Sequence, residues 1–142
     1  MPAEADPIAA TERFLDLLEN GDRAGLTAML DDDVVWSVPM TATGDPGDVV
    51  RVEGKDAFLA RVGKLETITR TVRFVDRRIS VTADGATTFV QARGDFRTTG
   101  GTPYRNTYVF RFDWLRGKLR SWEEYANPIA VHRAFPELAP RS

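Results

Sequence analysis

The sequence predicts an α+β fold in which a curved antiparallel sheet wraps around N-terminal helices. Two observations indicate this class. Apolar residues follow helical spacing in most of the chain up to Leu65, whereas from Arg73 onward they recur at every second residue. Turn dipeptides then separate four such alternating segments. Helices on one face of an antiparallel sheet fit this order, and strong curvature would leave a pocket between the two layers.

Two helices are expected at the start of the chain. Asp6 and Pro7 suit the N-cap and the first helical position. Gly21 can end this helix in the left-handed conformation, and Asp22 can cap a second, shorter one. The apolar residues at helical spacing in these two segments are Ile8, Phe14, Leu15, Leu17, Leu18, Leu26, Met29 and Leu30.

The middle of the chain predicts a strand, a loop and a third helix. The acidic run 31–33 is interpreted as a solvated turn, and 34–39 as a short strand that Pro39 terminates. The segment 41–53 is rich in Gly, Pro and Asp, so we expect a loop at the mouth of the pocket. Residues 54–65 return to helical spacing, with apolar side chains at Phe58, Val62 and Leu65.

Four alternating segments predict the strands of an antiparallel meander: 73–83, 87–97, 104–114 and 118–126. The turns between them carry Asp84-Gly85, Gly100-Gly101 and Arg116-Gly117. Asn127 and Pro128 then suit the N-cap and first residue of a short C-terminal helix.

Composition excludes several classes of protein. The 142 residues suggest one domain spanning 1–142, and a net charge of −2 without a basic cluster argues against nucleic acid as a partner. With no Cys and a single His, His132, neither a metal site nor a thiolate nucleophile is expected. The acidic start of the chain does not resemble a signal peptide, and no segment approaches the roughly 20 apolar residues that span a membrane. The expectation is a cytoplasmic protein without membrane partners.

Polar residues on the predicted sheet are the candidates for chemistry. On the strand 87–97, Arg93 and Asp95 share one face, either as a solvated surface or as an acid held in place by a cation. On the next strand, Asn106 lies on the apolar face with Tyr108 and Phe110. A buried amide must find partners, so Asn106 bonds either a loop backbone or a ligand at the pocket rim.

The last strand contains two adjacent carboxylates, Glu123 and Glu124, and alternation does not decide which one faces inward. Glu124 shares its face with Trp122, and Glu123 shares the other face with Tyr125. A buried, unpaired carboxylate costs several kcal/mol or becomes protonated. An inward Glu therefore implies a partner such as Arg93 or a role in proton transfer.

The segments "YRNTYVFRF" and "GKLRSWEEYANP" resemble the nuclear transport factor 2-like superfamily, and within it the SnoaL-like polyketide cyclase group. The resemblance implies a cone-shaped, cystatin-like sheet around the N-terminal helices. The ending is also similar to that of the phenazine-biosynthesis A/B proteins, whose general acid falls on Glu124. A similarity to limonene epoxide hydrolase implies catalytic roles for Arg93, Asp95 and Glu124. The short first strand offers Trp36 and Val38, however, where that hydrolase holds its attacking water with Tyr and Asn.

Together these features predict a small-molecule enzyme that needs no cofactor. Glu124 and Asp95, with Arg93, would perform general acid–base chemistry of the isomerase, cyclase or epoxide-hydrolase type. The residues expected to contact a small, largely apolar substrate are Trp36, Asn106, Tyr108, Phe110 and Trp122. The alternative is a binding or accessory module in which Arg93, Asp95 and Glu124 form a structural ion-pair network.

A homodimer is expected through the outer face of the sheet. On the strand 104–114, Arg105, Thr107, Val109 and Arg111 form a mixed strip that a second copy could cover. The family resemblance favours the dimer more strongly than this strip does. A monomeric mass in sedimentation or light scattering would contradict the expectation.

Overall fold

The computed structural model describes residues 6–138. Its helices are α1 (Pro7–Asn20), α2 (Arg23–Met29), α3 (Lys55–Ile68), α4 (Pro128–Ala134) and a 3-10 turn, η1 (Pro136–Leu138). Its strands are β1 (Leu30–Val38), β2 (Val50–Glu53), β3 (Thr69–Thr71), β4 (Phe74–Val81), β5 (Thr87–Thr98), β6 (Pro103–Leu115) and β7 (Lys118–Ala126).

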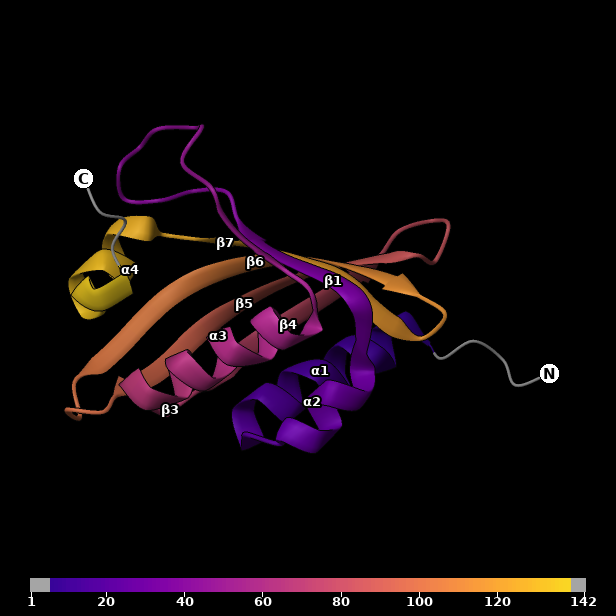
Figure 1. The fold of residues 1–142 in the computed structure, drawn as a ribbon, viewed down its shortest axis with the longest axis horizontal. Helices are drawn as coiled ribbons and strands as arrows, with labels where there is room; N and C mark the ends of the chain where they lie inside the picture. The colour runs from indigo at the N-terminus through magenta and orange to yellow at the C-terminus, as the bar shows by residue number, and fades with distance from the viewer. Residues whose placement is uncertain (1–5, 139–142) are drawn as a thin grey trace.

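One sheet holds all the strands in the order β2-β1-β7-β6-β5-β3, and β4 also pairs with β5. The meander from β4 to β7 is antiparallel as predicted, but β1 runs parallel to β7, so the sheet is mixed. In Figure 1, α1, α2 and α3 lie together on one side of the curled sheet, and α4 lies at its far end. The predicted α+β class, a curved sheet with the helices on its concave side, is confirmed.

The predicted helix caps form as hydrogen bonds. Asp6 accepts from the backbone N–H of Ile8 at 3.0 Å, and Asp22 accepts from that of Gly25 at 2.9 Å. Gly21 ends α1 with a φ of 64°, in the left-handed region. Asn127 caps α4 through the N–H groups of its first turn. These short-range signals locate the helix ends because each one depends on only a few consecutive residues.

Three predictions for the middle of the chain are wrong. The acidic run 31–33 belongs to β1 and is no turn, and residues 50–53 of the expected loop form β2 against β1. The third helix extends to Ile68 and is followed by the short β3, which has no counterpart in the predicted elements. Residues 50–53 pair with β1, and β3 pairs with β5, whereas residues 31–33 lie in the irregular stretch of β1 between its pairs Leu30–Leu119 and Val35–Ser121. These pairings depend on residues distant in sequence.

A β-bulge on β7 explains why alternation did not decide the orientation of its carboxylates. Ser121 pairs with Asp113, yet Leu119 pairs with the very next residue of β6, Trp114, so Arg120 is an extra residue on β7. Leu119 and Trp122 are consequently both buried, although an unbroken strand would place them on opposite faces. Beyond the bulge the alternation is regular, and Glu124 shares the inward face of Trp122.

A second bulge, on β4, places an arginine that forms ion pairs with α1. Asp76 has a φ of 55°, and the register of β4 against β5 shifts at this point. The next residue, Arg77, turns toward α1 and pairs with Glu12 at 2.7 Å, Asp16 at 2.9 Å and Glu19 at 2.9 Å. One guanidinium thus binds three successive turns of the helix.

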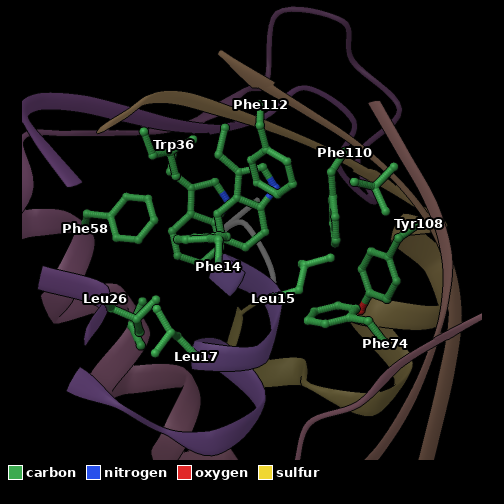
Figure 2. Close-up of a cluster of buried hydrophobic side chains, with 14 of the residues drawn as sticks. Phe14, Leu15, Leu17, Leu26, Trp36, Phe58, Phe74, Tyr108, Phe110 and Phe112 are labelled. Carbon is green, nitrogen blue, oxygen red and sulfur yellow. The ribbon is translucent and has the colours of Figure 1, made fainter. Parts of the chain in front are cut away.

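Aromatic side chains dominate the core between α1, α3 and the sheet. Phe14 of α1 is fully buried, and its ring meets those of Phe58, Phe112 and Trp122 edge-on. Figure 2 shows Phe14 in the middle of this cluster, with Trp36 and Phe112 above it. The indoles of Trp36 and Trp122 stack with centroids 4.2 Å apart. The core therefore joins α1 and α3 to the central strands.

Substitution of Gly94 by Ala is expected to lower the free energy of unfolding by about 1–3 kcal/mol. A Cβ at this position of β5 would lie 2.5 Å from Cε2 of Tyr108, a buried side chain whose hydroxyl is already hydrogen-bonded. Gly100→Ala is the control, because its Cβ would find no atom nearer than 3.8 Å. Chemical denaturation measures both variants, and equal midpoints would contradict the prediction.

Across residues 6–138, no helix combines the length and apolar character needed to cross a membrane.

Candidate functional site

A cavity of about 170 Å³ lies between the concave face of the sheet and the helices. Its walls come from the central strands, from α3, from α4 with the following turn, and from the loop after β1. Most of the lining side chains are apolar or aromatic, which is typical of small-molecule sites. They include Trp36, Val38, Met40, Val62, Leu65, Val72, Phe74, Phe96, Tyr104, Tyr108, Phe110, Trp122, Val131 and Phe135.

Glu124 is the carboxylate on the sheet wall of this cavity. Its Oε1 accepts a hydrogen bond of 3.2 Å from Nε1 of Trp36, whereas within residues 6–138 its Oε2 has no hydrogen-bond partner. Burial raises the pKa of Glu124, and the charge of Arg61 and the Trp36 hydrogen bond oppose that rise without cancelling it. The protonated form is therefore more accessible near neutral pH than for an ordinary Glu.

Glu124→Gln is expected to unfold at a higher denaturant concentration than the natural protein at pH 7. Burial raises the folded-state pKa of Glu124 above the unfolded value of about 4.3, so protonation of this side chain adds to the free energy of unfolding. This stabilisation is fully present below about pH 4.3 and is lost as the pH rises through the folded-state pKa. Gln imitates the protonated acid at every pH, so its advantage should shrink to nothing toward pH 4. Urea denaturation at several pH values measures this difference, and a variant less stable at pH 7 would contradict it.

Arg61 of α3 faces the same cavity. Its guanidinium carbon lies 4.8 Å from the centroid of the Trp36 ring, a cation–π distance. Burial lowers the pKa of Arg61, and the charge of Glu124 partly opposes that effect, but a guanidinium remains charged. No ion pair links the two within the described part of the chain, and the Nε of Arg61 is buried without an acceptor.

Two phenols form a hydrogen-bonded chain on β6, the strand that pairs with the Glu124 strand β7. Nδ2 of Asn106 donates to the hydroxyl of Tyr104 at 2.7 Å, and the hydroxyls of Tyr104 and Tyr108 lie 3.0 Å apart. Only one of the two phenolic protons is used between the rings, so the other is available to an acceptor in the cavity. Burial raises the pKa of both phenols, Tyr108 more strongly, so both remain protonated.

Asn106 does not line the cavity, contrary to the prediction that it contacts substrate. Its Nδ2 also donates to the carbonyl of Asn127, and its Oδ1 accepts from the backbone N–H groups of Thr107 and Asn127. All of its hydrogen-bonding capacity is thus used within the protein, and the two bonds with Asn127 join β6 to the start of α4. The structural alternative, a bond to loop backbone, is the one that the geometry favours.

The prediction that Arg93 and Asp95 act together with Glu124 in the cavity is also contradicted, because both residues lie on the outer face of the sheet. Both side chains are largely exposed, Arg93 pairing with Asp76 and Asp95 lying 3.9 Å from Arg105. Alternation along β5 buries Ala92 and Gly94 instead. Neither residue can meet Glu124 through the sheet, so the expected acid–cation group does not assemble and neither does the expected ion-pair network.

The other predicted contacts converge on the cavity. Trp36, Tyr108, Phe110 and Trp122 line it together with Glu124. Glu123 points to the opposite face, where the hydroxyl of Tyr125 donates to it. The structure therefore places Glu124 inside, while its chemical role stays a prediction.

His132 lies at the rim of the cavity with its side chain exposed. Among the residues that the structure describes, no three His, Cys, Asp or Glu side chains are grouped closely enough to hold a metal ion.

Sequence reasoning missed two polar residues of the site, Arg61 and Tyr104. Arg61 occupies the i+3 position of the apolar helical face defined by Phe58, Val62 and Leu65, an unusual place for a charge. Tyr104 shares the strand face of Tyr108 and is buried with it. In both cases a polar group on an otherwise apolar face was the signal that could have identified them.

Residues 11–122 match the family model of the SnoaL-like domain. The chain is 24% identical over 124 residues to the uncharacterised protein YesE of Bacillus subtilis (strain 168), and the match covers 87% of this chain and 82% of that protein.

Solved structures share the fold. A candidate isomerase from Bacillus subtilis superposes with a TM-score of 0.80 at 22% identity, covering 99% of this chain and 100% of the other. An epoxide hydrolase from M. tuberculosis, similar to limonene epoxide hydrolase, superposes with a TM-score of 0.70 at 21% identity, covering 96% and 93%. Similarity at this level of identity establishes the architecture and leaves the chemistry to the site itself.

Proposed function

Because this chain belongs to the SnoaL-like domain family, we propose that its cavity binds a small, largely apolar molecule and that Glu124 transfers a proton to or from it. The main support is the position of Glu124, an inward-facing carboxyl group on the sheet wall of a mostly apolar cavity, held by Trp36. Perturbed carboxyl groups in such surroundings are frequent acid–base catalysts.

Glu124 suits proton transfer in both directions. A carboxyl group whose pKa lies above its usual range is closer to neutral pH, where it can both accept and donate. The hydrogen bond from Trp36 fixes Oε1, so Oε2 is the atom that exchanges the proton. Rigid positioning of this kind is what aligns a base with a C–H bond.

The Tyr104–Tyr108 pair can supply a hydrogen-bond donor for the negative charge that proton removal creates. Removal of a proton beside a carbonyl places negative charge on the carbonyl oxygen, and a positioned O–H donor stabilises that charge. The unused proton of the Tyr104–Tyr108 pair is such a donor. Glu124 takes the C–H proton as the enolate forms, and returns it to a different carbon in an isomerisation. In an aldol-type ring closure the enolate instead forms a carbon–carbon bond, and the protonated Glu124 delivers its proton to the new alkoxide.

Isomerisation or cyclisation fits the site better than epoxide opening. The arginine and aspartate that the epoxide-hydrolase comparison requires, Arg93 and Asp95, are on the outer face, and the amide of Asn106 is fully used. Among the described residues that line the cavity, β1 contributes Trp36 and Val38 and no Tyr or Asn of the kind that holds the attacking water in limonene epoxide hydrolase. This favours substrates with an acidic C–H bond over epoxides.

Deuterium incorporation tests the proposal without knowledge of the natural substrate. Small cyclic ketones and β-keto esters are incubated with the protein in D₂O, and NMR follows the loss of the C–H signal beside the carbonyl. Binding of each compound is measured in parallel by calorimetry. At least one bound compound should exchange faster than in buffer alone. Binding without accelerated exchange throughout the panel would overturn the catalytic proposal in favour of a ligand-binding module.

A further inference from the structure

We propose that the natural ligand of this cavity is an apolar organic acid whose single carboxylate is bound by Arg61. The inference rests on the proposed function for the choice of cavity, but it does not require Glu124 to transfer a proton. It concerns which molecules bind, and it can be tested by binding alone.

Arg61 differs from the other half-buried arginine on the concave side of the sheet. Arg77 is held by three carboxylates of α1. Within residues 6–138, Arg61 donates no hydrogen bond to the protein, and its Nε is sealed from solvent without an acceptor. A buried donor without a partner is costly, and the cost is greater for a charged group. A ligand that supplies acceptor oxygens would remove this cost.

Glu124 does not supply the acceptor oxygens that Arg61 lacks. The two side chains line the same cavity without direct contact between their charged atoms, and Oε1 of Glu124 is already bound to Trp36. Arg61 itself packs over the face of the Trp36 ring. This stacking orients the planar guanidinium, and an oriented guanidinium is well matched to the two oxygens of a carboxylate.

The remaining walls define the rest of the ligand. Phe74, Phe96, Phe110 and Val72 offer aromatic and aliphatic surface but no charge. Of the described residues that line the cavity, the cationic candidates are Arg61 and the exposed rim residue His132, whereas Glu66 and Glu124 are acids. A molecule with several negative charges would meet too little positive charge, so the site favours one carboxylate on an apolar body.

Calorimetric titration with three probes of similar size tests the proposal: phenylacetate, phenylacetamide and 2-phenylethanol. The natural protein should bind the acid about 10- to 100-fold more tightly than the amide or the alcohol, as expected for hydrogen bonds to a charged group. Arg61→Met should abolish this preference, and Arg61→Lys should keep part of it because the charge remains without the planar fork.

Arg78→Met is the matched control, since it removes the same charge from an exposed position on β4 that does not line the cavity. It should retain the full preference. Equal binding of acid and amide by the natural protein, or a preference that survives in Arg61→Met, would overturn the proposal. If Arg61→Met does not fold, the titrations of the natural protein and Arg61→Lys decide the outcome.

Glu124→Gln separates this inference from the proposed function. The variant should still prefer phenylacetate, because the carboxylate is bound by Arg61. Loss of proton exchange with retained acid preference would support both proposals. If the natural protein prefers the acid but catalyses no proton exchange, the catalytic proposal alone is refuted. If the natural protein catalyses exchange but does not prefer the acid, the present proposal alone is refuted.

Discussion

Glu124→Gln is expected to lower the rate of deuterium exchange into a bound carbonyl compound by about 10²- to 10⁴-fold, the usual contribution of a positioned acid–base group. Gln keeps the size of the side chain and an oxygen that can accept from Nε1 of Trp36. What it removes is the group that takes the proton. NMR of the exchanging C–H signal measures the loss, and calorimetry should find nearly unchanged binding of an uncharged ketone.

Glu123→Gln is the matched control for this experiment. It makes the same chemical change one residue away, on the outer face where Glu123 accepts from Tyr125. Exchange should continue at the natural rate. If Glu124→Gln exchanges as fast as the natural protein, or if the two variants lose activity equally, Glu124 has no place in the chemistry.

Phe14→Ala is expected to lower the free energy of unfolding by about 3–5 kcal/mol. Phe14 is fully buried and packs its ring edges against Phe58, Phe112 and Trp122 (Figure 2). Truncation removes contacts among α1, α3 and two central strands at once, and the rigid sheet cannot collapse fully into the space. Urea denaturation gives the free energy, and thermal melting should show a midpoint lower by roughly 10 °C or more.

Phe89→Ala provides the comparison for Phe14. Phe89 is 40% exposed on β5, so the same truncation should change stability far less. A small loss in Phe14→Ala, comparable to that of Phe89→Ala, would mean that α1 is not anchored to the sheet through this ring. In Figure 1, α1 lies beside α2 and α3 on one side of the curled sheet.

Short-range chemistry in the sequence was enough to locate most elements. The caps at Asp6, Asp22 and Asn127 and the left-handed Gly21 lie where the sequence predicts them. The strand 118–126 has the predicted bounds, and the other three strands of the meander agree to within a few residues. These signals succeed because a cap, a turn or an alternating face depends only on neighbours along the chain.

The candidate site was predictable only in part. The resemblance of the ending "WEEYANP" to a known family singled out Glu124, and the structure places that side chain in the cavity. The predicted partners of Glu124 were wrong, because alternation along a strand shows which residues share a face but does not show which face is concave. Arg93 and Asp95 share a face, and it is the outer one.

The sequence by itself determined the order of the helices and of the four meander strands, the capped helix ends and the apolar faces of the central strands. Only the tertiary structure showed that Glu124 faces the cavity and that Arg61 and two tyrosines line the same cavity. The physical reason is that the bulge at Arg120 changes which residues of β7 face inward, while the sheet that encloses the cavity also requires pairing between strands far apart in sequence, such as β1 and β7. A residue's neighbours in the cavity are set by that pairing, and local spacing carries no information about it.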